Sequence, residues 1–195
     1  MNNGLEAIVL RVGNLTGRYI DGVFQKNIND NMFYNMLKCM LTIGVIPNNI
    51  LDMELELTPV DLCADAICKI ASYKESNKKV YHLCNNNTIS LGSVMETIEA
   101  LGYKMTHLEI DDFIEQINSI KSLSSDSTAL LLVNDYNYEK FLDKNYNVSI
   151  SCKITNNYLQ KVGFEWPIVD EDYIIKIMKH IEYVGFIKQL ALTEN

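Results

Sequence analysis

The chain has 195 residues, of which 48% are hydrophobic, and its 17 basic and 25 acidic residues give a formal net charge of −8. No apolar run is long enough to span a membrane, and the first residues lack the basic-then-apolar order of a signal peptide. We therefore expect a soluble, cytoplasmic protein with no membrane partner. The negative charge opposes sequence-independent attraction to nucleic acid, so no nucleic-acid partner is expected. The length fits one domain or one large subdomain.

Cysteine and histidine usage indicates neither disulfides nor a metal site. The cysteines are odd in number and lack a Cys-x-x-Cys pair, so we expect buried thiols in a reducing compartment. The three histidines are spread along the chain without the spacing of metal ligands, and no metal is expected. The residues concerned are Cys39, Cys63, Cys68, Cys84 and Cys152, and His82, His107 and His180.

The first predicted element is a strand over residues 5–12, because its nearly continuous apolar run is typical of a parallel strand buried on both faces. A loop with two glycines, Gly13 and Gly17, follows directly. Such a loop is expected at the carboxyl end of a parallel strand, where open α/β sheets bind ligands. Only a few residues precede the strand and nothing in them could hold a nucleotide, so we interpret the chain as the back half of a larger enzyme.

Two helices and a second strand are predicted next. Apolar residues at helical spacing predict a helix that starts at Asn29 or Asp30 and stops at Gly44. Asp61 is interpreted as the N-cap of a second helix rather than as a catalytic acid. Residues 80–84 are predicted to form a strand. This order predicts two adjacent parallel strands joined by a crossover, which are the last strands of a doubly wound sheet.

The rest of the chain is predicted to be mainly helical. Ser90 is expected to cap a helix that ends near Leu101, with Gly102 in a left-handed conformation. Residues 105–110 are expected to form a short edge strand, and Asp111 is expected to cap the helix that follows. The remaining predicted elements are a polar loop at 122–127 and helices at 129–142, 156–162 and 171–190.

Four blocks of sequence carry a resemblance to a known family. They are residues 11–18 (RVGNLTGR), 21–25 (DGVFQ) with Asn27 and Asn31 behind them, 56–67 (ELTPVDLCADAI) and 163–167 (GFEWP). In this order they resemble the C-terminal part of the thioester reductase domains that close nonribosomal peptide synthetase assembly lines. Those domains belong to the extended short-chain dehydrogenase/reductase family. The match runs from Gly4 to about Ile187.

The resemblance implies an α/β fold that is the C-terminal portion of a Rossmann-like extended short-chain reductase. Residues 1–103 would hold the last strands and helices of the sheet, together with the cofactor and substrate loop. Residues 104–195 would form a mainly helical substrate-binding subdomain. The nucleotide-binding half would lie upstream, outside this sequence.

The resemblance also implies candidate site residues in the first of these regions. Gly13, Asn14 and Leu15 would form the wall beside the nicotinamide, although the two glycines of the loop could simply permit a tight turn. A second set would bind the substrate and its pantetheine arm. That set is Arg18, Phe24, Gln25, Asn31 and Lys38. Three of its members have plainer interpretations, because Arg18 could pair with Asp21 at the surface, Phe24 could be core, and Lys38 could be solvated.

No catalytic residue is assigned. Reductases of the resembled family use a Tyr-x-x-x-Lys pair, in which the lysine lowers the tyrosine pKa so that the phenol can donate a proton. Two such strings occur, Tyr34 to Lys38 and Tyr136 to Lys140. Both follow the Gly13 loop, whereas the family's pair precedes it, so we interpret both as chance. The chain is therefore expected to be inactive alone and not to bind NADP(H) tightly.

The implied function is reductive release of a carrier-bound peptidyl or acyl thioester as an aldehyde or alcohol, with NADP(H) as the cofactor of the parent enzyme. The implied partners are an acyl or peptidyl carrier protein with its phosphopantetheine-linked substrate, and the upstream Rossmann half. A non-native dimer is also expected, because the first strand would expose an apolar edge. Two alternatives stay open: another extended reductase or nucleotide-sugar epimerase, and a non-catalytic module that docks a carrier domain.

Overall fold

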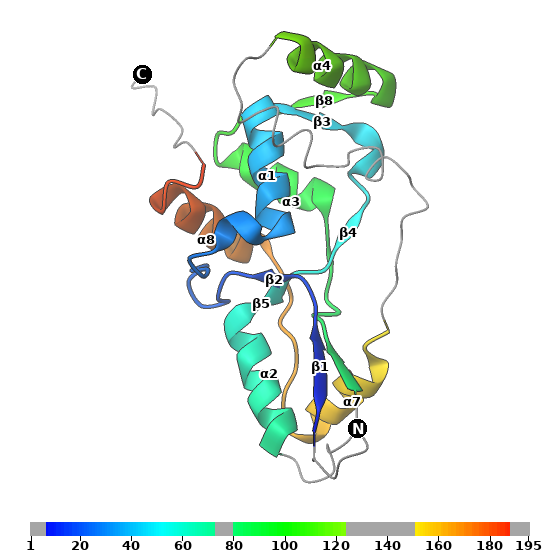
Figure 1. Ribbon diagram of the computed structural model, residues 1–195, viewed down its shortest axis with the longest axis vertical. Helices are drawn as coiled ribbons and strands as arrows, with labels where there is room; N and C mark the ends of the chain where they lie inside the picture. Colours follow the sequence, from blue (N-terminus) through cyan, green and yellow to red (C-terminus); the bar gives the residue numbers. More distant parts are fainter. Residues whose placement is uncertain (1–6, 73–79, 124–150, 188–195) are drawn as a thin grey trace.

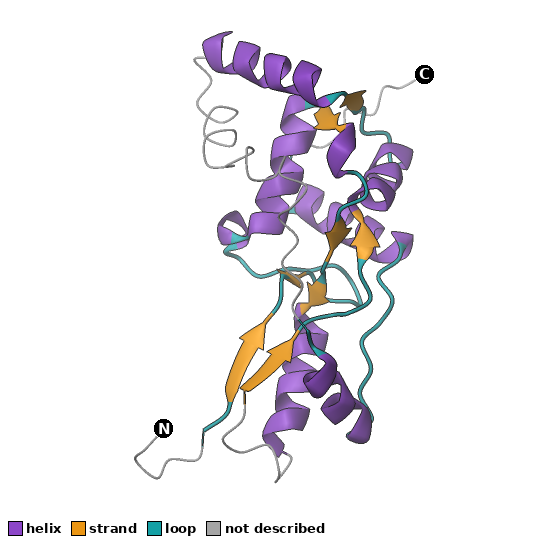
Figure 2. Ribbon diagram, turned by 90° about the vertical axis from the view of Figure 1, so that its right-hand side faces the viewer, coloured by secondary structure: helices purple, strands orange, loops and turns teal. Residues whose placement is uncertain are grey.

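The computed structural model describes residues 7–72, 80–123 and 151–187, and its helices and strands form two groups along the long axis (Figure 1). The lower group consists of strands β1 (Val9–Val12) and β6 (Val80–Leu83) with helices α2 (Val60–Ser72) and α7 (Lys153–Lys161). The upper group consists of α1 (Met32–Ile43), α3 (Leu91–Ala100) and α8 (Glu171–Tyr183), followed by β3 (Val45–Pro47), β8 (Thr106–Leu108) and α4 (Ile110–Leu123). Short strands join the two groups (Figure 2).

Strand pairing is mainly parallel, and the predicted α/β fold class is confirmed. β1 pairs with β6 in parallel, with Val9 opposite Val80 and Val12 opposite Leu83. Because β1 and β6 are adjacent and are joined by a crossover that contains α1 and α2, the predicted strand arrangement is confirmed. The remaining pairs are β2 (Leu15–Thr16) with β5 (Thr58–Pro59), β3 with β8, and the antiparallel β4 (Glu54–Leu55) with β7 (Ile89–Ser90).

The prediction that the first strand is buried on both faces is wrong for β1. The side chains of Val9 and Val12 are 36% and 45% exposed, and Val80 opposite Val9 is 47% exposed. Leu10 is partly buried against the core beneath β6. Among the described residues β1 pairs only with β6, so it lies at the edge of this two-stranded sheet. Helix α7 packs against β6.

Two clusters of buried side chains form the core. The upper core joins α1, α3 and α8, and contains Tyr34, Leu37, Met95 and Tyr173 among others. The lower core joins α2, β6 and α7 to the segment that contains Trp166. Both clusters combine residues from before and after position 103, so the described chain packs as one unit across the predicted division. The division at residue 103 stays a prediction.

The helix ends show which local signals were interpreted correctly. Ser90 caps α3, where its hydroxyl accepts from the Ser93 N–H at 3.0 Å, and Gly102 has the predicted positive φ of 101°. α1 ends at Gly44 as predicted, but its N-cap is Asn31, because Asn29 and Asp30 belong to a preceding 3-10 turn.

Two predicted caps are wrong. Asp61 and Asp111 each lie inside the first turn of a helix, since α2 begins at Val60 and α4 begins at Ile110. A carboxylate is favourable in a first turn because it faces the positive end of the helix dipole, which explains why the sequence signal was shifted by a residue or two.

The later element boundaries also differ from the predictions. β8 lies within the predicted strand at 105–110 and pairs with β3, which was not foreseen. α4 continues through Leu123, so the polar loop does not begin at Ser122, and the rest of that loop and the helix at 129–142 lie outside the described residues. α7 begins three residues before Asn156, and α8 ends at Tyr183 because Gly185 has a φ of 69°.

No helix in the described ranges is long and apolar enough to cross a membrane.

Thiol labelling should distinguish Cys68 from the other four cysteines. Cys68 is exposed on α2, whereas the other thiols are buried, and burial raises the pKa of Cys39 and of Cys63 to about 11. Because the thiolate is the reactive form, we expect one rapidly labelled thiol per native chain at neutral pH. A disulfide-exchange reagent followed by absorbance measures this. Cys68→Ser should abolish the rapid phase, and more than one rapid equivalent would contradict the burial of the other thiols.

Candidate functional site

The loop after β1 is held between two other strands. The Gly13 N–H donates to the Leu83 carbonyl at 2.8 Å, so the loop leaves β1 still bonded to the end of β6. One residue later, the Asn14 carbonyl accepts from the Thr58 N–H at 2.9 Å, and the chain then pairs with β5. The loop therefore lies at the carboxyl ends of parallel strands, which is where open α/β sheets bind ligands.

Glu56 lies directly against this loop. Its Oε2 accepts from the Asn14 N–H at 2.6 Å, and its Oε1 accepts from the Asn85 N–H at 3.1 Å and from the Thr58 hydroxyl. Burial raises the pKa of Glu56, although the three hydrogen bonds oppose that effect. Sequence reasoning did not select this residue. Its signal was a single acid between Leu55 and Leu57, both of which are buried.

Gly13 leaves room for the Glu56 carboxylate, which a side chain at position 13 would displace from its present place. A Cβ at position 13 would lie 2.7 Å from Cδ of Glu56 and closer still to Oε2, while its φ is not positive. The alternative that Gly13 merely permits a tight turn is therefore incomplete, because the missing side chain makes room for the carboxylate.

Two buried tyrosines hold the next part of the loop. The Gly17 N–H donates to the Tyr34 hydroxyl at 2.8 Å, and the Tyr173 hydroxyl donates to the Gly17 carbonyl at 2.6 Å. The Thr16 hydroxyl lies 2.7 Å from the same Tyr173 oxygen. Burial raises the pKa of both phenols far above the ordinary value. These groups fix Gly17 between α1 and α8.

The string from Tyr34 to Lys38 does not have the properties of a catalytic pair. The Tyr34 side chain is fully buried and its pKa is raised, whereas a phenol that acts as a proton donor beside a lysine has a lowered pKa. The Lys38 ammonium lies over the Phe186 ring, 4.5 Å from its centroid. The second string, from Tyr136 to Lys140, lies outside the described residues.

Asn31 connects the loop to α1. Its Nδ2 donates to the Leu15 carbonyl at 2.7 Å, and its Oδ1 accepts from the Tyr34 N–H at 3.2 Å as the N-cap of the helix. Asn31, which was predicted to bind substrate, is therefore bonded directly to Leu15 of the predicted cofactor wall.

Replacing Asn31 should weaken both connections at once. For Asn31→Ala we expect a loss of about 2 kcal/mol in the free energy of unfolding, because a helix cap and a side chain to backbone bond are removed together. Asn35→Ala is a matched control, since the Asn35 amide makes an exposed bond to the Asn29 carbonyl. Urea titration measures both. Equal losses in the two variants would contradict a special role for Asn31.

The other predicted substrate residues differ in their surroundings. Arg18 is exposed and pairs with Asp21, with Nε 2.9 Å from Oδ1, and this hydrogen bond lowers the pKa of Asp21. Phe24 is buried in the upper core, with its ring centroid 4.8 Å from that of Tyr34, and Gln25 is exposed. The plainer interpretations of Arg18 and Phe24 thus describe their contacts in this structure.

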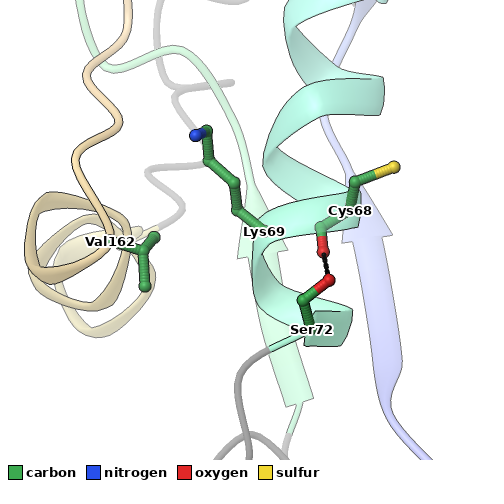
Figure 3. Close-up of a pocket in the computed structure, with 4 residues that line it drawn as sticks. All are labelled: Cys68, Lys69, Ser72 and Val162. Atoms are coloured by element: carbon green, nitrogen blue, oxygen red, sulfur yellow. Dashed lines mark hydrogen bonds between the residues drawn. The ribbon is translucent and has the colours of Figure 1, made fainter.

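A surface hollow of about 330 Å³ lies elsewhere, between α2 and the end of α7 (Figure 3). It is lined by Cys68, Lys69, Ser72 and Val162. Within it the Ser72 hydroxyl donates to the Cys68 carbonyl at 2.8 Å, which is an ordinary contact within a helix. These residues lie at the far end of α2 from the Gly13 loop, so the hollow is separate from the candidate site (Figure 1).

No protein-family model matches the chain, but comparison with known proteins identifies proteins of similar sequence and structure. A thiolation-reductase di-domain from an archaeal nonribosomal peptide synthetase superposes with a TM-score of 0.78 at 25% identity, over 94% of this chain and 37% of that one. The terminal R domain of the myxalamid PKS-NRPS pathway gives 0.75 at 28% identity, over 95% and 46%. A linear gramicidin synthase polypeptide of Brevibacillus parabrevis is 22% identical over 98% of this chain and 4% of its own length. The chain therefore spans less than half the length of each of these relatives.

Proposed function

Because the chain is a relative of the reductase domains of nonribosomal peptide synthetases, with the fold of extended short-chain reductases, we propose that it forms the substrate-binding portion of an NAD(P)H-dependent thioester reductase. The reaction is reductive release of a carrier-bound peptidyl or acyl thioester as an aldehyde or alcohol. The observation that carries this proposal is the Gly13–Arg18 loop, which is hydrogen-bonded at the carboxyl ends of parallel strands in a chain related to reductases.

The cofactor wall is proposed at Gly13, Asn14 and Leu15. A bound nicotinamide supplies the hydride for this chemistry. The N–H groups of Gly13 and Asn14 already donate to Leu83 and Glu56, so contacts with the carboxamide would come from other atoms of the loop. The bonds from Glu56 and Asn31 keep the loop in one conformation, which lowers the ordering cost of binding.

The substrate side is proposed at Arg18, Gln25 and Lys38, together with Asn31, which is bonded to the loop, and Phe24, which is buried in the upper core. The Arg18 guanidinium is exposed and could exchange Asp21 for the phosphate of a phosphopantetheine arm, whose geometry it matches in bidentate fashion. Because this exchange replaces the Asp21 carboxylate by a phosphate at the same guanidinium, the binding energy would be modest and would depend on salt.

The remaining parts of the site are proposed to come from a nucleotide-binding half outside these residues. It would supply the proton donor and the phosphate-binding turn, and it would pair with the exposed edge of β1. The chain alone is then expected to be inactive, and the uncovered edge would favour association of separate copies, which light scattering measures.

Nicotinamide absorbance tests the proposal directly. NADPH and an acyl-pantetheine thioester are mixed with this chain, and in parallel with a polypeptide in which it follows the nucleotide-binding half of a related reductase domain. Oxidation by the longer polypeptide alone is the expected result. Absence of turnover in both, with a melting temperature raised by a loaded carrier protein but not by nucleotide, would instead indicate a non-catalytic docking module.

A further inference from the structure

Glu56 joins three segments that are far apart in the sequence. It contacts the loop after β1 through Asn14, the segment after β6 through Asn85, and the start of β5 through Thr58. Asn85 is itself fully buried, and its amide donates to the Leu57 and Pro167 carbonyls at 3.1 and 3.2 Å. The carboxylate is thus a common acceptor at the point where the carboxyl ends of β1 and β6 meet β5.

The ionised form of the side chain suits this bonding pattern best, because it can accept hydrogen bonds on both oxygens. The Asn14 and Asn85 N–H groups approach different oxygens of the carboxylate, and the Thr58 hydroxyl shares the second oxygen. The Asn85 N–H also donates to the Thr58 hydroxyl oxygen at 2.8 Å, which is shorter than its 3.1 Å contact with Glu56. A protonated acid, or a glutamine, can still accept from Asn14 and donate to Thr58, but its bond to the Asn14 N–H loses the negative charge that strengthens it.

Ionisation of Glu56 opposes stability. Burial is the largest influence on its pKa and raises it, so the folded chain holds this proton more tightly than the unfolded chain does. The contribution of Glu56 to stability is therefore present at low pH and is lost as pH rises through its titration. Groups that are kept in such an environment are characteristic of functional sites.

Two cysteine thiols have pKa values that the Glu56 carboxylate influences. They are Cys63 on α2 and Cys84 after β6, and burial is the main cause that raises the pKa of each. Glu56 adds to the rise at Cys63, and at Cys84 the Cys152 thiol and then Glu56 add to it. Both stay protonated in the acidic range. A titration of the loop in that range would therefore report Glu56.

We propose that Glu56 is the positioning residue of this site: its carboxylate holds the backbone of Asn14 against Asn85 and Thr58, and so sets the conformation of the loop that forms the cofactor wall. The effect of Glu56 on cofactor binding rests on the proposed function, whereas its effect on the conformation of the loop does not. Protonation of Glu56 would remove the charge that strengthens its bond to the Asn14 N–H and would loosen the wall.

The hold on the loop is tested in the chain itself by following backbone amide resonances against pH. We expect the Asn14 and Asn85 amide protons to shift together, with one shared midpoint above the ordinary range of a glutamate. In Glu56→Gln both shifts should become independent of pH over that range. Glu54→Gln is the matched control, because Glu54 is exposed on β4 two residues earlier, and it should behave as the wild type does.

The consequence for binding is tested by the nicotinamide absorbance assay of the longer polypeptide. Loss of a charge-assisted hydrogen bond predicts that Glu56→Gln raises KM for NADPH about tenfold. In the wild type KM should rise toward the variant's value as pH falls through the titration, whereas the variant's KM should stay flat. A role in stability alone would not produce this difference in pH profile.

The two tests separate the inference from the proposed function. Independent midpoints for the two amides, or a Glu56→Gln enzyme with the wild-type KM and pH profile, would overturn the role of Glu56. If the wild-type polypeptide shows no turnover, the proposed function fails, and the amide titration still decides whether Glu56 holds the loop. That titration uses the wild type, so it remains decisive even if Glu56→Gln does not fold.

Discussion

Gly22→Ala should lower the free energy of unfolding by about 3 kcal/mol or more. Gly22 has a φ of 74°, and a Cβ there would lie 2.7 Å from the Ile177 backbone nitrogen and closer still to the Lys176 carbonyl. Both are backbone atoms of α8, so no side-chain rotation can relieve the overlap. The segment that follows the candidate loop would have to move away from the helix.

Gly163→Ala is the matched control for this variant. Gly163 has nearly the same φ, 72°, but a Cβ there would meet no atom within 4 Å. Its cost should be only the conformational part, about 1 kcal/mol. Thermal or urea unfolding of both variants isolates the contribution of the contact with α8. Equal losses would show that the approach of the loop to the helix is looser than described.

A second large effect is expected for Tyr173→Phe. The change removes the hydroxyl that donates to the Gly17 carbonyl at 2.6 Å and lies 2.7 Å from the Thr16 hydroxyl. Thr16 is fully buried, so water cannot replace the lost partner at low cost. We expect a loss of about 2 to 3 kcal/mol, which is typical when buried polar groups lose a hydrogen-bond partner.

Two further variants give this prediction its controls. Tyr183→Phe makes the same chemical change on a side chain that is 88% exposed, and it should alter stability by less than about 0.5 kcal/mol. The double variant Thr16→Val with Tyr173→Phe removes both hydroxyls of the pair and should cost less than the sum of the single changes. Strict additivity would contradict a direct bond between Thr16 and Tyr173.

Several features of the fold could be predicted because their signals are local. The capping serine before α3 and the left-handed glycines at positions 44 and 102 act on neighbouring backbone, and each was placed correctly. The parallel pairing of β1 with β6 also followed from the order of elements, since a strand, helices and a second strand favour a crossover connection. Asp61 and Asp111 were predicted as N-caps but lie inside the first turn of their helices. Aspartate is favourable at both kinds of position, so its presence alone does not tell them apart.

The candidate site was only partly predictable for a different reason. The sequence indicated the Gly13 loop and its place at the end of a strand, but the role of its first glycine depends on a carboxylate 43 positions later. Asn31 was selected for the substrate, and its bond to the loop backbone was not foreseen. Contacts of this kind carry no periodic signal, because they join single residues across long separations.

Local backbone preferences and apolar spacing were therefore sufficient for the α/β class, the β1–β6 pairing, the end of α1 and both ends of α3. The exposure of β1, the burial of Tyr34 and the placement of Glu56 against Asn14 were decided by tertiary packing. Each depends on which distant segment covers a given residue. That information lies in the three-dimensional arrangement of the segments, where the low local polarity both raises the pKa of Glu56 and strengthens the bonds that hold it.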